Sequence, residues 1–156
     1  MTDPGHHAAA AHGIERSPRW PGVRRAHLKQ FPYCAFCPPP SRTTRLLAWL
    51  RLHRVEVHHI LPFHFVVALG RPDLELDERN LATLCSGKRD HHLHFGHLDN
   101  FQTFNPLVRE WAEHGGRHSA VRAPVTLGMM SDADKEDFRA MMDRMYPKVG
   151  TQGGAA

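Results

Sequence analysis

The chain has 156 residues and a mass of 17.7 kDa, enough for one hydrophobic core of ordinary size and too little for two. Hydrophobic residues make up 41% of it, but no apolar run could span a bilayer and the N-terminus lacks the pattern of a secretory signal. We therefore expect a cytoplasmic protein with one domain at residues 16–147, between disordered tails at 1–15 and 148–156.

The net charge of +4 is unevenly distributed. Residues 16–54 contain nine Lys or Arg residues and no Asp or Glu, whereas residues 131–147 contain five acidic and three basic residues. Such a basic block is either a solvated surface or a footprint for the phosphate backbone of nucleic acid, because cations that neutralise phosphates release condensed counterions. The residues that we assign to DNA binding on this basis are Arg24, Arg25, Lys29, Arg51 and Arg54.

The first predicted elements are two short helices and a strand. Residues 20–29 are expected to be helical because Pro21 suits a first helical turn and the apolar residues after it share one side. The leucine-rich residues 43–53 predict a second helix with one apolar stripe. Residues 55–60 alternate in polarity and are rich in β-branched side chains, which indicates a strand ended by Pro62.

The central part of the chain predicts a second strand and a helix. Residues 63–69 are expected to form a helical turn, and residues 80–85 a strand antiparallel to the first. A helix is expected to run from residue 91 to residue 95 or beyond. The order of strand, long loop, strand and helix predicts an α+β fold.

Two helices are predicted in the last third of the chain. Residues 107–112 follow a proline and are expected to be helical. Ser131 is a suitable N-cap for a helix at residues 132–145, because its hydroxyl can accept from a free backbone N–H. The residues expected on the buried face of this helix are Phe138, Met141, Met142 and Met145.

The three cysteines favour a metal site. Cys34 and Cys37 form a C-x-x-C motif, and Cys85 is distant. A redox pair is one interpretation, but no βαβ pattern surrounds the motif and three prolines follow Cys37. Structural zinc prefers four thiolate or imidazole ligands, so the three cysteines need one partner, for which His91 is the natural candidate.

Two histidine pairs and one asparagine suggest phosphodiester hydrolysis. This reaction needs a base for the attacking water and positive charge on the phosphate, and an imidazole can accept a proton or bind a metal ion. Successive residues of a strand face opposite sides, so one of His58 and His59 can bind a metal while the other acts as the base. Asn80 can hold the loop between the strands by hydrogen bonds to the backbone, and His92 can supply a second metal ligand.

The order and spacing of these motifs, over about residues 17–106, resemble the HNH endonucleases, which are ββα-metal (His-Me finger) nucleases. The motifs that carry the resemblance are the Cys34 to Cys37 knuckle, Glu56-Val57-His58-His59-Ile60-Leu61-Pro62, Asn80-Leu81-Ala82-Thr83-Leu84-Cys85 and the histidines after Cys85. The resemblance implies a small ββα-metal core with a structural zinc knuckle and flanking helices.

The resemblance also implies roles for individual residues. His58 would bind the catalytic divalent ion together with His92, His59 would be the general base, and Asn80 would have an orienting role. The implied cofactors are Mg²⁺, Mn²⁺ or Ni²⁺ at the catalytic site and Zn²⁺ at the knuckle. His97 is five residues after His92, so it becomes a third ligand if the helix is short or broken near this point.

One departure from the family pattern leaves the zinc ligands open. Members with a zinc knuckle usually carry a second C-x-x-C before the last histidine, but here Cys85 is followed by a stretch that reaches Asp90 and His91. Either His91 closes a Cys₃His site, or Asp90 is the fallback ligand. This register also decides which of His91 and His92 is catalytic.

Two functions from different classes follow from these residues. The first is a metal-dependent DNA endonuclease that hydrolyses phosphodiester bonds with a histidine base and one divalent ion. The second is a zinc-stabilised nucleic-acid-binding module without activity. The intact set of His59, Asn80 and His92 favours the nuclease, because a binding module has no chemical need for it.

Overall fold

The computed structural model describes residues 14–38, 41–43, 54–117 and 130–148. The chain divides into two compact units, Met1–Pro124 and Val125–Ala156. Residues 44–53, which include Arg51 and most of the predicted second helix, lie outside the described residues. Within the described part of the chain, none of the helices has the length and apolar character needed to cross a membrane.

A two-stranded antiparallel sheet lies at the centre of the first unit. It consists of β1 (Val55–His59) and β2 (Leu81–Cys85), paired in a register that sets Val57 opposite Thr83 and His59 opposite Leu81. Both strands and their antiparallel pairing were predicted from the sequence. With the helices around the sheet, the unit belongs to the mixed α and β class.

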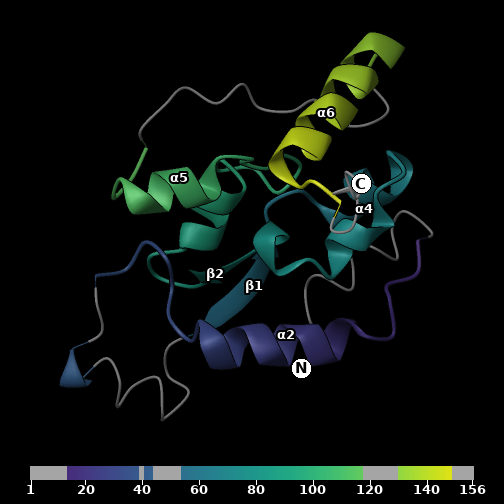
Figure 1. Ribbon diagram of the computed structural model, residues 1–156. Helices are drawn as coiled ribbons and strands as arrows, with labels where there is room; N and C mark the ends of the chain where they lie inside the picture. The colour runs from purple at the N-terminus through teal and green to yellow at the C-terminus, as the bar shows by residue number, and fades with distance from the viewer. Residues whose placement is uncertain (1–13, 39–40, 44–53, 118–129, 149–156) are drawn as a thin grey trace, which may run out of the picture. The chain divides into compact units, whose positions relative to one another are not determined.

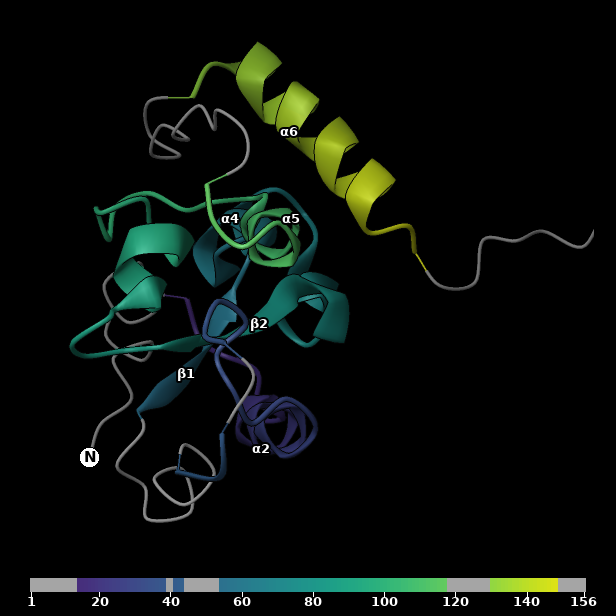
Figure 2. The ribbon, with the colours of Figure 1, turned by 90° about the vertical axis from the view of Figure 1, so that its left-hand side faces the viewer.

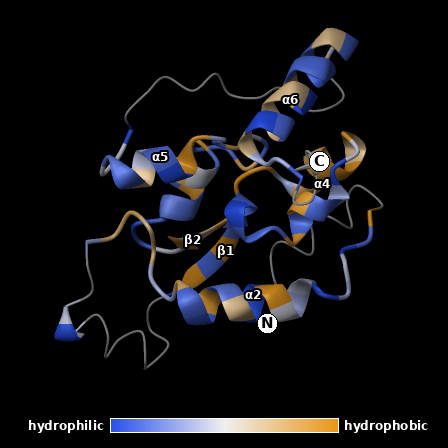
Figure 3. Cartoon of the chain, in the orientation of Figure 1, coloured by the Kyte–Doolittle hydropathy of each residue, from blue (hydrophilic) through white to orange (hydrophobic). Residues whose placement is uncertain are grey.

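Helices lie on both sides of this sheet. Figures 1 and 2 show α2 (Trp20–Gln30) on the opposite side of the strands from α4 (Phe63–Ala68) and α5 (Val108–Glu113). Figure 3 shows that α2 carries both hydrophilic and hydrophobic residues, as expected for a helix with one face on the sheet. Its Trp20 ring lies 4.4 Å from the His59 ring of β1, centroid to centroid.

The long connection between the strands is built from short helical turns. After Pro62 it contains α4 and the 3₁₀ turns η1 (Pro72–Glu75) and η2 (Glu78–Asn80). Apolar residues of this connection and of the strands make up much of the core. Their burial stabilises the fold because it removes apolar surface from water. The largest fully buried apolar side chains of the first unit are Phe104, Ile60, Leu61, Leu74, Leu81, Leu84, Val66 and Val108.

The helix predicted after β2 is a single π-helical turn, η3 (His92–Gly96). The N–H of His97 donates to the carbonyl of His92 over 3.1 Å, an i→i+5 hydrogen bond. The expected position is therefore correct, but the expected α-helical spacing is wrong. Isolated π-turns of this kind are rare, and those that do occur are frequently found at functional sites.

The second unit contains α6 (Asp132–Met145). Ser131 caps it as predicted: its Oγ accepts from the Asp134 N–H over 3.1 Å, and the Asp134 carboxylate accepts from the Ser131 N–H over 3.0 Å. Met142 is buried, but Met145 is 38% exposed, so the predicted buried face is wrong at this residue. The helix ends there, and Tyr146 is buried in its place, four residues after Met142.

His27 on α2 is a buried histidine that the sequence does not assign to any site. Neither of its ring nitrogens has a hydrogen-bond partner among the described residues, and the nearest carboxylate oxygen, on Glu78, is 4.0 Å away. Burial lowers the pKa of His27, and Arg109 acts in the same direction, while Glu78 opposes both. His27 is therefore neutral in the folded protein.

We predict that His27 destabilises the protein in acid. Because its folded pKa lies below the unfolded value of about 6.5, the unfolded chain takes up the extra proton as the pH falls. The neutral His27 thus costs the fold no stability by this route above about pH 6.5, and the free energy of unfolding falls as the pH drops below that value. The free energy of unfolding of wild type should fall faster than that of His27→Phe between about pH 7 and pH 5 in urea titrations, and parallel curves would contradict this.

Candidate functional site

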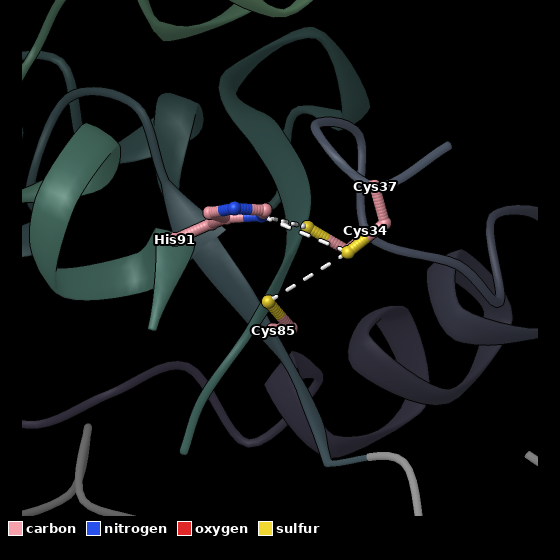
Figure 4. A group of neighbouring side chains, drawn as sticks. All are labelled: Cys34, Cys37, Cys85 and His91. Carbon is pink, nitrogen blue, oxygen red and sulfur yellow. Dashed lines mark hydrogen bonds between the residues drawn. The ribbon is translucent and has the colours of Figure 1, made fainter. Parts of the chain in front are cut away.

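Three cysteines and one histidine converge beside the sheet. Figure 4 shows the sulfurs of Cys34, Cys37 and Cys85 turned toward one another and toward the ring of His91. The Nδ1 of His91 lies 3.3 Å from the Cys34 sulfur and 3.7 Å from the Cys37 sulfur, and the Cys37 and Cys85 sulfurs are 4.0 Å apart. The sequence reasoning chose these four residues, and the structure brings them together.

The spacing of these four atoms fits a tetrahedral zinc ion. With Zn–S bonds of about 2.3 Å and a Zn–N bond of about 2.0 Å, tetrahedral ligands lie about 3.4–3.8 Å apart. The observed separations of 3.3–4.0 Å fall close to that range. Burial raises the pKa of the Cys34 thiol to about 12, so a thiolate there requires a cation beside it. The cluster can therefore hold a metal ion such as zinc.

Backbone hydrogen bonds fix the C-x-x-C turn on β2. The Cys37 N–H donates to the Cys34 carbonyl over 3.2 Å, and the Ala35 N–H donates to the Thr83 carbonyl over 2.9 Å. Since Thr83 is two residues before Cys85 on the same strand, the turn is held beside the third sulfur. Arg89 donates to the Cys37 sulfur over 3.9 Å.

We predict that the purified protein contains one zinc per chain and that His91 is a ligand. Cys34→Ser and His91→Ala should lose the metal and with it much of the stability, because structural zinc contributes directly to folding. His91→Cys should retain zinc, since four thiolates also satisfy it, and His92→Ala should retain it as the matched control. Mass spectrometry would measure the metal content of each variant, and thermal melts would measure its stability. A metal-free wild type, or zinc retained by His91→Ala, would contradict the assignment.

The second cluster consists of His58, His92 and His97. Each offers one ring nitrogen, and these nitrogens all lie within 4.8 Å of one another. The ring centroids are 4.8–5.1 Å apart. His58 comes from β1, His92 is the first residue of η3, and His97 directly follows its last residue. The structure thus brings together the two predicted metal ligands and the optional third.

Hydrogen bonds orient two of these three rings. The Nδ1 of His97 lies 2.7 Å from the carbonyl oxygen of Thr103, and the Nδ1 of His92 lies 3.3 Å from a carboxylate oxygen of Glu56. Each Nδ1 therefore carries a proton and donates it, so Nε2 is the nitrogen of each ring that these two contacts leave unused. Such outer partners, a carbonyl or a carboxylate, are typical of metal-binding histidines.

His58 provides the test of whether a cation fits. It is 3% exposed, and its Nε2 is a buried polar atom without a hydrogen-bond partner among the described residues. Burial lowers the pKa of His58 well below its usual value, and His97 and His92 lower it further, so the ring is neutral. A buried ring nitrogen without a partner is costly, and a divalent ion bound to it would remove that cost. The donor set therefore fits a metal ion.

The π-turn explains how His92 and His97 meet. In an α-helix the side chains that share a face are three or four residues apart. The i→i+5 hydrogen bond widens the turn by one residue, so two histidines five apart lie on one side. Gly96 is essential to the packing of this turn, because a Cβ there would lie 3.0 Å from Leu84 Cδ1 and 3.1 Å from His58 Cε1.

Gly96→Ala should therefore damage the three-histidine cluster. An added methyl group would displace His58 or the turn, at a cost of about 1–3 kcal/mol for overpacking. Gly22→Ala on α2 is the matched control, since nothing lies within 4 Å of its added Cβ, and alanine favours a helix by up to about 1 kcal/mol. Chemical denaturation would compare the stability of the two variants, and Mn²⁺ titration would compare their affinity for the metal. Equal stability and equal Mn²⁺ affinity in both variants would contradict the expected clash.

His59 lies next to this cluster with one nitrogen already used. Its Nε2 is 3.0 Å from the carbonyl oxygen of Glu75, so Nε2 carries the proton and Nδ1 the lone pair. Burial lowers the pKa of His59 to about 3, and the nearby Arg16 guanidinium contributes, so the ring is neutral. Trp20 packs against the ring. His59 therefore has a fixed tautomer, with the proton on Nε2 and the lone pair on Nδ1.

Asn80 holds the loop that carries these contacts. Its Oδ1 accepts from the Leu61 N–H over 2.8 Å, and its Nδ2 donates to the carbonyls of Leu61 and Leu74 over 3.1 and 2.9 Å. The side chain is fully buried. The predicted hydrogen bonds to the backbone are thus confirmed. Because Leu74 adjoins Glu75, Asn80 also fixes the carbonyl that orients His59.

A cavity of about 370 Å³ joins these groups. Four consecutive β1 residues, Glu56 to His59, line it, so the cavity reaches both faces of the strand. His92 and His97 line it as well, and Arg16 lies there with its guanidinium carbon 4.8 Å from the centre of the Trp20 ring. His59 and the three-histidine cluster therefore border the same cavity.

The predicted DNA-binding cations have different surroundings. On α2, Arg25 and Lys29 are exposed, whereas Arg24 is half-buried. The pKa of the Glu56 carboxyl is lowered mainly by His92, and Arg24 lowers it further. Arg54 is exposed at the start of β1. Arg109 of α5 donates to the backbone carbonyls of Glu78 and Leu81, and so ties α5 to the sheet.

Sequence reasoning missed several residues of the site. Glu56 could have been found, because it is two residues before His58 and so shares its face of β1. The carbonyl of Thr103 has no signal in the sequence, since any residue supplies one. Asn105 is fully buried and donates to the Phe95 carbonyl over 2.9 Å, beside η3. Its only signal is the turn-forming Asn105-Pro106 pair.

Comparisons with known proteins do not assign the chain to a family. No protein-family model, curated protein or solved structure matches it significantly. The resemblance to HNH endonucleases consequently rests on the order of motifs, and the function has to be inferred from the chemistry of the two clusters and the cavity.

Proposed function

We propose that this protein is a metal-dependent DNA endonuclease of the HNH type, with β1, β2 and η3 as its ββα-metal core. The observation that carries the proposal is that a neutral histidine with a fixed tautomer, His59, and a cluster of three neighbouring histidines line one cavity. A base and a cation on the same phosphodiester are the two requirements of its hydrolysis. Zinc in the Cys₃His cluster would be structural, since no ligand position stays open there.

His58, His92 and His97 would hold the divalent ion through their free ring nitrogens. The ion would supply positive charge to the phosphate and its leaving oxygen. Glu56 supports this role because its carboxylate accepts from His92, which fixes the ring and increases its basicity. Three protein ligands leave positions for substrate and water, as in catalytic rather than structural metal sites.

His59 would act as the general base. With Nε2–H on the Glu75 carbonyl, its Nδ1 can take a proton from the attacking water. Asn80 would be a positioning residue, because it bonds to the loop and not to the cavity. A binding module without activity would need neither the fixed tautomer of His59 nor the oriented set of three neighbouring histidines.

DNA is the proposed substrate because the groups around the cavity include cations. Arg16 lines the cavity, and Arg25 and Lys29 are exposed on α2, next to the sheet. Such cations would contact the phosphate backbone with little sequence preference. Binding should therefore weaken as the salt concentration rises.

The test is cleavage of plasmid DNA with Mg²⁺, Mn²⁺ or Ni²⁺. His59→Ala should lower the rate by about 10²–10⁴-fold, the usual contribution of a general base. His97→Ala should lower both the rate and the affinity for Mn²⁺ while the zinc content stays unchanged. The matched control is His114→Ala, an exposed histidine at the end of α5, which should cut like wild type.

Two results would contradict the proposal. Equal rates for wild type and His59→Ala would remove the base from the mechanism. DNA binding without cleavage under any of the three metals would instead favour the zinc-stabilised binding module.

A further inference from the structure

Phe101 is an exposed aromatic residue beside the three-histidine cluster. Its side chain is 63% exposed, the largest fraction among the exposed large apolar residues of the described chain. Its ring centroid lies 4.9 Å from that of His97 and 6.0 Å from that of His92, and it lines the cavity. Such exposure costs hydrophobic free energy that a ligand could recover.

The loop that carries Phe101 is held in an unusual backbone conformation. Leu98 and Asp99 both have positive φ angles, 53° and 68°, which residues with a Cβ rarely adopt. The Asp99 carboxylate is bound on both sides, by His94 and by Arg117, each over 2.5 Å. Conformations of this kind persist only where the surroundings hold them, and they cluster at ligand sites. Phe101 is thus presented by a fixed loop.

The cavity behind Phe101 combines aromatic walls with a cation. Its aromatic lining, apart from the histidines, consists of Trp20, Phe63, Phe65, Phe101 and Phe104. The Arg16 guanidinium carbon lies 4.8 Å from the Trp20 ring centre and 5.5 Å from that of Phe63. A volume of about 370 Å³ is within the range of small-ligand pockets. Flat aromatic surfaces beside a cation suit a ligand that is planar and attached to a phosphate.

An unpaired nucleobase has this chemistry. In a continuous duplex both faces of each base are covered by its neighbours, so an aromatic side chain can reach a face only where the base is unpaired or flipped out. Proteins that bind single strands combine a positive groove with aromatic rings on which bases stack. The phosphate attached to such a base would lie near the three histidines, because Phe101 contacts two of them.

We infer that this cavity takes one unpaired base of a DNA strand, stacked on Phe101, and that the protein therefore acts on single-stranded or locally unpaired DNA in preference to continuous duplex. The inference rests on the proposed nuclease function for the identity of the substrate. It adds the strandedness of that substrate and a residue that selects it.

The test is binding of short fluorescent DNA without added divalent ion, followed by anisotropy. Wild type should bind a single strand more tightly than the matching duplex, and one abasic position in the strand should weaken binding by about 5- to 100-fold, the equivalent of one stacked base. Phe101→Ala should lose the same factor and become insensitive to the abasic position. Phe31→Ala is the matched control, since this ring is 43% exposed at the end of α2 and does not line the cavity.

Cleavage assays on the same DNA separate this inference from the proposed function. If Phe101→Ala loses its base discrimination but wild type cuts nothing with any metal, base binding stands and the nuclease proposal fails. If wild type cuts DNA in a manner dependent on His59, but binds duplex and single strand equally and Phe101→Ala behaves like Phe31→Ala, only the inference fails.

Discussion

The hydrogen bond from the His97 N–H to the His92 carbonyl is the interaction on which the three-histidine cluster depends. It makes η3 a π-turn, so that two histidines five residues apart face His58 on the neighbouring strand. His91, directly before the turn, points into the cysteine cluster. One short turn therefore connects the candidate zinc site to the candidate catalytic site, and a zinc ion bound at its start would fix the position of the histidines at its end.

The state of the three-histidine cluster follows from burial. Three imidazoles with ring centres about 5 Å apart would repel one another if protonated, and burial lowers the pKa of both His58 and His97. Imidazole rings gathered in this way gain little from one another. Their arrangement makes sense when a shared cation is the partner, because each of them then contributes a lone pair that is already oriented. The outer contacts to Glu56 and Thr103 maintain this orientation.

The loop between the strands has a comparable role for His59. Asn80 bonds to three backbone groups of that loop, and the Glu75 carbonyl accepts from His59. The carboxylate of Glu75 accepts in turn from the Ser17 N–H over 3.1 Å, which ties the segment before α2 to the same place. This hydrogen bond limits the rotation of the His59 ring, so that the ring keeps one orientation at the edge of the cavity. One small sheet and its connections can thereby position the proposed metal ligands, the proposed base and an exposed aromatic ring.

The sequence by itself determined the parts of this protein whose signal is local. The strands and the Ser131 cap were predicted because each depends on residues close together in the chain. The antiparallel pairing was predicted as well, although it joins strands that are more than twenty residues apart. The members of the two clusters were also predicted, since cysteine and histidine are the residues that metals select. Tertiary structure decided what depends on distant packing. The π-turn packs with Gly96 close against His58 of β1, which is far away in the sequence. Thr103 and Glu75 act through backbone carbonyls, which every residue has and no sequence pattern reveals. The exposure of Phe101 follows from a loop that Asp99 holds, and no pattern within the sequence distinguishes it from a core phenylalanine.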